Sequence, residues 1–445
     1  MERKVEIHKF GGGVLGHEGE GVKFIDSILD AREGGKKIVV LSALEDVTDI
    51  LREGEWFGVL AKYSELGREL IPDDEYYREF ALRIKEFKWR LERGRKFITR
   101  SEILGLGELL STYLVYFHRR AQKRNVGLID LYNEFPIIVK EYKPFDSDPD
   151  LEEIRKRRRL IEEYLEKYDE VFMPGFLAYT KDERVVTLGR GGSDTTAILV
   201  GCVLKDYSQV YLWKETRGIR TADPKIVKEN KLVKYLSLSE ALNIALFGGE
   251  VLHYKGMRIA YEKDIRVVVP YIKNPNIYTI IDRKDREPEE WRSRVKYVGG
   301  TVEALQVPVP YEKLGKFIEV LLRENLGDFT HMVGPLLHPQ LIILEGSKLL
   351  RNEMEKEVKS ILERGRRVAV VNVVGDGLGP AKGVLERGAK AIAEHTSILG
   401  NVSSVRNGIQ TEGAYMSFAV EPSFFEETVR VLHREFVEKD PSWSN

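Results

Sequence analysis

The ten residues from Thr187 to Thr196 read TLGRGGSDTT, and they combine three glycines with one arginine, one aspartate and four hydroxyls. Glycines let backbone N–H groups come close to a ligand, and the planar guanidinium of Arg190 matches a carboxylate or a phosphate. The apolar run from Ala197 to Val203 indicates a buried helix after the loop, whose N-terminal end adds positive potential. We therefore predict an anion-binding loop here and favour this interpretation over a purely structural turn.

A second glycine-rich stretch, Gly11 to Gly13, lies between a predicted strand (Val5 to Phe10) and a predicted helix that ends before Gly34. The apolar run Lys37 to Ser42 is typical of a buried parallel strand, so the segment is predicted to form a βαβ unit. Lys9 stands directly before the glycines as a point charge for a phosphoryl group. The stretch lacks the spacing of a P-loop, so it is a different kind of phosphate site.

Three polar residues are candidates for contact with a small substrate. Glu108 begins an otherwise apolar helix, and a carboxylate buried there needs a partner, either a substrate ammonium or a neighbouring arginine. The residues alone favour neither partner. Ser42 and Thr48 follow the second predicted strand, at the carboxyl edge of the sheet where α/β proteins bind their ligands.

The run from Thr187 to Thr196 resembles the substrate loop of aspartate kinases in the amino-acid kinase superfamily. Three more stretches follow the same order as in that family: Lys9 to Gly12, Gly107 to Ser111, and Thr221 to Lys225. The resemblance covers residues 5 to 285 well. It implies an α/β fold in which a three-layer αβα catalytic domain spans residues 1 to 285.

The resemblance also implies an activity, ATP-dependent phosphorylation of L-aspartate to 4-phospho-L-aspartate with ATP and Mg²⁺ as cofactors. This is the first step towards lysine, threonine and methionine. It implies that the amino-acid substrate is bound by Thr48, Glu108, Arg190, Gly191, Gly192 and Ser193, and it favours the ammonium as the partner of Glu108. It implies that the nucleotide is bound by Lys9, Gly11, Gly12, Ser42, Lys214, Glu215, Arg220, Asp223 and Lys225. The catalytic residues are then Lys9, Arg190 and Asp194.

The chemistry of this reaction agrees with the residues present. A side-chain carboxylate is ionised at neutral pH, so its attack on the γ-phosphoryl group needs no general base. The site must instead neutralise charge and hold two anions in line. The eight histidines show no metal-ligand spacing, so no metal site made of protein ligands is predicted, and His8 is expected to face solvent.

Departures from the family pattern leave two alternatives open. Gly13 and Val14 stand where the family has Thr and Ser, and Glu250 replaces a lysine that faces phosphate. One alternative is a kinase for a hydroxyl amino acid such as homoserine, which needs a base, with Asp194 as the obvious candidate. The other is an amino-acid-sensing regulatory subunit without turnover, an interpretation motivated by Val14 and Glu250.

The C-terminal third, residues 296 to 445, alternates short strands and helices after a polar segment, Asn274 to Glu290, that we interpret as a linker. The alternation resembles the tandem ACT regulatory domains of aspartate kinases, with Val373 to Gly377 as the best match. An α+β ferredoxin-like fold, an amino-acid effector and a homodimer or higher homo-oligomer are implied. A chain of 445 residues is long enough for two or three domains.

Composition excludes several classes of partner. The net charge is −1 with 32% charged residues, which is not typical of a protein that binds nucleic acid or a membrane surface. No apolar run is long enough for a membrane helix, and the first residues are charged rather than apolar. The single cysteine, Cys202, lies in an apolar run, where we expect a core residue and a reducing compartment, so a cytoplasmic location is predicted.

Overall fold

The structure is a computed structural model that describes residues 5–16, 19–31, 35–94, 96–132, 135–205, 208–249, 251–292, 294–323, 330–333, 340–344, 356–376, 378, 383–402 and 415–443. The chain divides into two compact units. Unit 1 comprises Met1–Gly218 and Lys255–Ile280, and unit 2 comprises Ile219–Tyr254 and Ile281–Asn445. Compact units do not define functional domains, so the predicted domain ranges of 1 to 285 and 296 to 445 stay predictions.

The strands of unit 1 follow one another in their sheet in the order β3-β4-β2-β1-β7-β9-β10. The strands are β1 (Val5–Phe10), β2 (Lys37–Leu41), β3 (Val126–Leu128), β4 (Glu170–Pro174), β7 (Ser208–Trp213), β9 (Val267–Tyr271) and β10 (Asn274–Asp282). The pairs from β3 to β9 are parallel. All five residues of β2 are buried, as expected for a parallel strand covered by helices on both faces.

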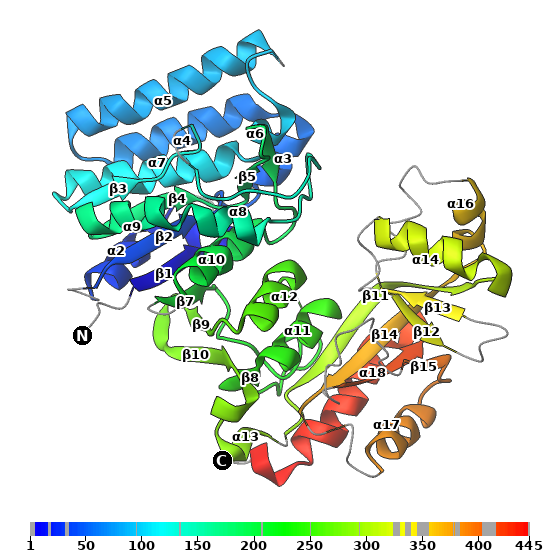
Figure 1. The fold of residues 1–445 in the computed structure, drawn as a ribbon. Helices are drawn as coiled ribbons and strands as arrows, with labels where there is room; N and C mark the ends of the chain where they lie inside the picture. The colour runs from blue at the N-terminus through cyan, green and yellow to red at the C-terminus, as the bar shows by residue number, and fades with distance from the viewer. Residues whose placement is uncertain are drawn as a thin grey trace. The chain divides into compact units, whose positions relative to one another are not determined.

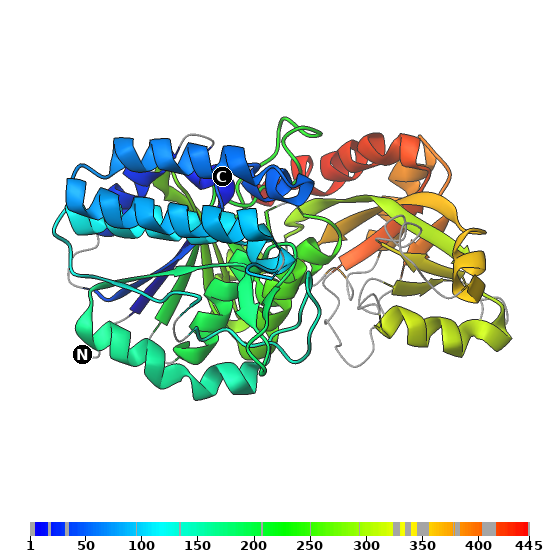
Figure 2. The same ribbon diagram turned by 90° about the horizontal axis from the view of Figure 1, so that it is seen from above.

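Helices form the outer layers of unit 1. Helix α7 (Leu106–Ala121) packs on β2, β3 and β4, and both α4 (Trp56–Leu70) and α5 (Asp74–Arg93) pack on α7. Figures 1 and 2 show α4 and α5 on one side of the sheet and α9 (Arg158–Lys167) on the other. The remaining helices of the unit are α1 (Gly12–Leu15), α2 (Val22–Asp30), α3 (Val47–Glu53), α6 (Arg100–Leu104), α8 (Leu151–Lys156), α10 (Gly192–Val203) and α12 (Tyr254–Lys263). The predicted three-layer α/β architecture is therefore confirmed.

Several details of unit 1 differ from the sequence predictions. The charged segment from Asp148 to Lys167 has the sequence pattern of one helix, but it forms two, α8 and α9, because Arg157 between them leaves the helical conformation. The segment from Asn274, which we interpreted as the start of a linker, forms strand β10. The first residues of this strand are exposed, which explains their polar character. His8 is buried rather than solvent-facing: its ring stacks on Tyr211 of β7 at 5.0 Å and accepts a hydrogen bond from the Trp213 indole at 3.0 Å. Cys202 is buried, as predicted.

Unit 2 contains an antiparallel six-stranded sheet in the order β12-β13-β11-β14-β16-β15. Its strands are β11 (Tyr297–Pro308), β12 (Thr330–Val333), β13 (Gln340–Ile343), β14 (Arg366–Val374), β15 (Gly400–Val402) and β16 (Tyr415–Val420). The long strand β11 pairs with both β13 and β14. The sequence also favours a short strand from Ser403 to Val405, but these residues lie outside the part of the chain that the structure describes.

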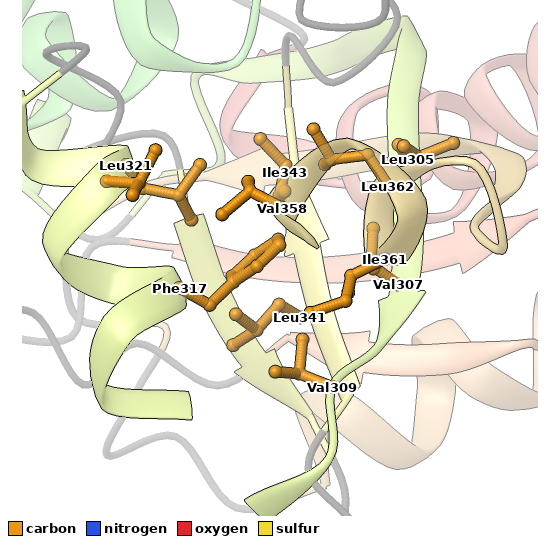
Figure 3. Packing of buried hydrophobic residues seen from close by; sticks show 11 residues of the cluster. Leu305, Val307, Val309, Phe317, Leu321, Leu341, Ile343, Val358, Ile361 and Leu362 are labelled. Carbon is orange, nitrogen blue, oxygen red and sulfur yellow. The ribbon is translucent and has the colours of Figure 1, made fainter. Parts of the chain in front are cut away.

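Helices pack on this sheet to form the core of unit 2. Phe317 and Leu321 of α14 (Leu314–Arg323) meet Leu341 of β13 and Val358 of α16 (Lys356–Leu362) in one apolar cluster, shown in Figure 3. Helix α18 (Phe425–His433) packs on β11 and β14, and α17 (Val384–Ala393) packs on α18. Strand β8 (Tyr235–Ser237), α11 (Leu238–Leu246) and α13 (Glu289–Arg292) also belong to the unit. The predicted α+β ferredoxin-like fold is confirmed. No helix among the described residues is both long and apolar enough to span a membrane.

A buried ionic cluster joins separate segments of unit 2. Glu240, Glu287 and Asp376 each offer an oxygen within 4.8 Å of the others, a spacing that a metal ion accepts. However, the Lys296 ammonium donates to Glu240 Oε2 at 2.7 Å and to Glu287, and the Asp376 backbone N–H donates to Glu240 Oε1 at 2.6 Å. Because Lys296 already supplies a cation to the cluster, we interpret it as a buried ion-pair network.

Candidate functional site

Two lysines and one aspartate meet at the carboxyl edge of the unit 1 sheet. Lys9 lies near the end of β1 and Lys214 directly follows β7, and these two strands are parallel neighbours. Asp194, in the first turn of α10, forms an ion pair with Lys9 Nζ at 2.7 Å through one oxygen and accepts a hydrogen bond from Lys214 Nζ at 2.9 Å with the other. All three side chains are buried. Burial lowers the pKa of Lys9, and the Asp194 carboxylate opposes this shift. With both lysines protonated, the trio carries one net positive charge.

The first glycine loop lies against this group. A side chain at Gly11 would place its Cβ 2.9 Å from Lys9 Nζ, so glycine leaves room for the ammonium. At Gly13, a Cβ would lie 2.8 Å from the carboxyl carbon of Glu215. The carboxylate of Glu215 therefore occupies the space beside residue 13. A threonine side chain, which the family has at this position, would collide with that carboxylate.

The second glycine loop begins with left-handed backbone at Gly189 (φ 77°) and Gly191 (φ 73°), a conformation that glycine adopts readily. Helix α10 starts at Gly192, so the loop is shorter than predicted and Ser193 lies in the helix. Ser42, which follows β2, donates a hydrogen bond to Ser193 at 2.9 Å. Arg190 is exposed and makes no ion pair or hydrogen bond with the residues that the structure describes, so its guanidinium is accessible to a ligand.

Glu108 lies at the third position of α7 and is 4% exposed. Its Oε2 atom has no hydrogen-bond partner within the described part of the chain, and no arginine reaches it. Burial raises the pKa of Glu108 to about 7, although backbone N–H groups and Lys9 favour the charged form. Glu108 faces a pocket of about 250 Å³, lined also by Gly12, Gly13, Ser42, Ala43, Leu44, Glu45, Asp46, Thr48 and Asp49. A cationic group of a small ligand would satisfy this carboxylate.

Two positioning residues were missed at the sequence level. Tyr63 of α4 donates from its hydroxyl to Gly107 O at 3.0 Å and accepts from Leu44 N at 3.2 Å, so it ties the pocket loop to the start of α7. Lys255 of α12 donates to Asp146 at 2.5 Å and to the Leu188 carbonyl at 3.0 Å, which fixes the second glycine loop. Neither residue belongs to a sequence motif that could have indicated its role.

The remaining predicted nucleotide residues are divided between the two units. Lys214 and Glu215 belong to unit 1, whereas Arg220, Asp223 and Lys225 belong to unit 2. The Arg220 guanidinium donates two hydrogen bonds to Asn230, one to the side-chain oxygen Oδ1 and one to the backbone carbonyl, each at 2.6 Å. The Asp223 carboxylate accepts from Lys225 N at 2.8 Å and shapes a turn. Val14 is buried in α1, and Glu250 lies outside the described residues.

Comparisons with known proteins point to one family. The model of the amino acid kinase family matches residues 4–270. The chain is 28% identical to Aspartokinase 1, chloroplastic, of Arabidopsis thaliana over 353 residues, which are 76% of this chain and 61% of that protein. It is 26% identical to Lysine-sensitive aspartokinase 3 of Escherichia coli over 419 residues, 86% of this chain and 89% of that protein.

The matches to longer relatives are partial. The chain spans 31% of the bifunctional aspartokinase/homoserine dehydrogenase of Daucus carota, to which it is 29% identical over 296 residues, or 60% of this chain. In fold, the chain is similar to the crystal structure of E. coli aspartokinase III in complex with aspartate and ADP. The TM-score is 0.81 at 21% identity, over 97% of this chain and 99% of that one. The family model covers more than half of the chain and includes both glycine loops, so this protein belongs to the amino acid kinase family.

Proposed function

We propose that this protein is an aspartate kinase that uses ATP to phosphorylate the side-chain carboxylate of L-aspartate. The observation that carries the proposal is the buried Oε2 of Glu108, which has no hydrogen-bond partner among the described residues and lies in a pocket lined by Gly12 and Gly13. The names of the relatives support the same substrate, and the crystal structure of E. coli aspartokinase III holds aspartate and ADP.

The proposed binding mode uses each end of the amino acid. The substrate ammonium pairs with Glu108, and the α-carboxylate pairs with Arg190, whose planar fork suits a carboxylate. Thr48 and Ser193 orient the substrate, and a pocket of about 250 Å³ favours a small amino acid. The backbone N–H of Gly192 already donates to the Gly189 carbonyl at 2.9 Å, so we propose Gly191 as the further backbone donor beside Arg190.

The proposed reaction depends on charge neutralisation rather than on proton transfer. The acceptor carboxylate is ionised at neutral pH and attacks the γ-phosphoryl group directly. Lys9 and Lys214 together outweigh the single charge of Asp194, so the group that they form attracts the phosphoryl oxygens. Both oxygens of Asp194 are engaged by lysines, which makes this residue a poor general base and disfavours a hydroxyl acceptor such as homoserine.

The phosphates of the nucleotide are proposed to bind beside the first glycine loop of unit 1. Mg²⁺ needs oxygen ligands and is usually held by one or two carboxylates together with substrate phosphates. The carboxylate of Glu215 beside Gly13 fits this requirement, because its side chain is exposed. The ion would offset the negative charge of the phosphates.

Coupled ADP-release assays with L-aspartate, L-homoserine and L-glutamate test the proposal. We expect ADP release with aspartate and little with the other two. Turnover of homoserine alone would replace the proposal with the hydroxyl-kinase alternative. Absence of turnover with all three, together with tight binding of one amino acid in calorimetry, would identify the sensing regulatory subunit instead.

We also propose that residues 296–445 form two ACT-like regulatory domains, that an amino-acid effector binds there, and that the protein is a cytoplasmic homodimer. The ferredoxin-like sheet of unit 2 supports regulatory domains of this type. The crystal structure of E. coli aspartokinase III with lysine and aspartate, described as the T-state, supports an amino-acid effector in that protein. Light scattering and assays with added lysine or threonine test these points.

A further inference from the structure

The loop from Ile219 to Val233 in unit 2 has a fixed base and an exposed tip. At the base, Val233 N donates to Ile219 O and Thr221 N donates to Lys231 O, both at 2.9 Å. At the tip, Pro224 and Lys225 are exposed and Asp223 is half-buried. The tip carries the Asp223 and Lys225 side chains that we assign to the nucleotide, so the base determines where those side chains lie.

The C-terminal segment of the chain contacts this loop at three points, two at its base and one, at Ile226, next to its tip. His433, at the end of α18, shares a hydrogen bond of 2.9 Å with the Thr221 hydroxyl. Arg430 Nε donates to Ile226 O at 3.2 Å, and Lys231 Nζ donates to the Trp443 carbonyl at 2.7 Å. Of the side chains in these contacts, those of Thr221 and His433 are fully buried.

The directions of the hydrogen bonds follow from the partners. The Glu438 carboxylate can only accept, so His433 Nδ1 carries the ring proton and donates to Glu438 Oε1 at 3.0 Å. In the neutral ring Nε2 then accepts from the Thr221 hydroxyl, whose oxygen accepts in turn from Lys231 N at 2.9 Å. Glu438 reaches His433 because residues 434–438 form a π-helical turn, whose repeat brings residues five apart onto one side.

These two hydrogen bonds of the His433 ring, one accepted at Nε2 and one donated from Nδ1, require a neutral imidazole. Burial lowers the pKa of His433, Lys231 acts in the same direction, and the Glu438 carboxylate opposes them. A threonine hydroxyl held on both sides has one orientation, so the backbone of residue 221 is fixed two positions before Asp223.

We propose that His433 is a positioning residue for the adenine nucleotide, which holds the loop from Ile219 to Val233 in its binding conformation through the Thr221 hydroxyl. The inference rests on the proposed function, because it assigns the tip of this loop to ATP. It adds that the last turn of the C-terminal helix, remote in sequence from every kinase motif, contributes to nucleotide affinity.

Steady-state kinetics of four variants test the inference: His433→Ala, His433→Gln, Thr221→Val and Thr221→Ser. Loss of one buried hydrogen bond corresponds to roughly a tenfold change in an equilibrium constant. We therefore expect His433→Ala and Thr221→Val to raise the KM for ATP roughly tenfold, with little change in the KM for aspartate or in kcat. His433→Gln and Thr221→Ser keep a hydrogen-bonding atom and should restore most of the affinity.

His395→Ala is the matched control, because His395 is 40% exposed and pairs only loosely with Glu427 at 3.6 Å. An unchanged KM for ATP in both His433→Ala and Thr221→Val would overturn the inference, and so would equal rises in the two KM values. If His433→Ala does not fold, the KM for ATP of Thr221→Val compared with that of Thr221→Ser tests the inference. If the wild type lacks kinase activity, the proposed function fails, and calorimetry with Mg–ADP on the same variants still tests the positioning role.

Discussion

Replacement of Glu108 by glutamine measures two effects of the buried carboxylate separately, its effect on the stability of the fold and its effect on the affinity for aspartate. Glu108→Gln keeps the shape of the side chain and removes the charge from an atom that has no protein partner in the described structure. Two effects of opposite sign are expected. The ligand-free protein becomes more stable relative to wild type at high pH, while the affinity for aspartate falls.

The first effect follows from the pKa of Glu108, which burial raises from 4.5 to about 7. Because the folded protein holds this proton more tightly than the unfolded chain, the wild type loses stability as pH rises from 4.5 to about 7. A pKa difference of about 2.5 corresponds to about 3 kcal/mol. The stability of Glu108→Gln relative to wild type should therefore rise by about 3 kcal/mol between pH 4.5 and pH 8, measured by urea unfolding without ligand.

The second effect is loss of the proposed ammonium–carboxylate pair. Removal of one partner from a buried charge pair costs about 2–5 kcal/mol, so the KM for aspartate should rise on the order of 100-fold. In wild type, kcat/KM for aspartate should fall about tenfold per pH unit below pH 7, because a protonated Glu108 cannot accept the ammonium charge. In the variant this dependence should disappear.

Glu86→Gln on α5 is the matched control, since Glu86 is half exposed and pairs with Arg83 at 3.6 Å. It should leave the kinetics and the pH dependence unchanged. An aspartate KM that stays within twofold of wild type in Glu108→Gln would refute the assignment of Glu108 to the substrate. A stability difference independent of pH would refute the raised pKa.

Three further predictions concern the remaining charged groups. Arg190→Ala should raise the KM for aspartate by orders of magnitude while the melting temperature stays constant, because Arg190 is exposed; an unchanged rate at low aspartate would contradict its role. Gly13→Ala should displace the Glu215 carboxylate and raise the KM for Mg–ATP, and the double variant with Glu215→Ala should be no worse than either single one; additive effects would contradict the coupling. Lys296→Met leaves buried carboxylates without a counter-ion and should cost about 3–5 kcal/mol in urea unfolding, whereas the half-exposed Lys284→Met should cost less than about 1 kcal/mol; equal losses would contradict the account of the cluster.

Much of the architecture was predictable because it depends on local patterns. The βαβ unit around Gly11, the buried strand β2 and the helix after the second glycine loop all follow from apolar periodicity and glycine punctuation. The clustering of Lys9 and Lys214 depends in addition on the pairing of β1 with β7, which local patterns do not give.

Features that depend on tertiary partners were not predictable. His8 is polar and lies in a strand next to charged residues, yet it is buried because Tyr211 and Trp213 of the neighbouring strand cover it. Strand β10 resembles a linker in sequence because its first residues are polar and exposed, and its buried residues come only in its second half. Tyr63 gives no signal in the sequence, because its importance comes from Leu44 and Gly107, which are distant in the chain.

The central claim is that the acceptor is the side-chain carboxylate of aspartate, which makes the product an acyl phosphate. Hydroxylamine converts an acyl phosphate into a hydroxamate, whereas it does not react in this way with a phosphate ester. With ATP, L-aspartate and hydroxylamine, we predict one aspartyl hydroxamate formed for each ADP released, and loss of both in Arg190→Ala. ADP release from aspartate without hydroxamate, or phosphorylation of homoserine in preference to aspartate, would contradict the claim.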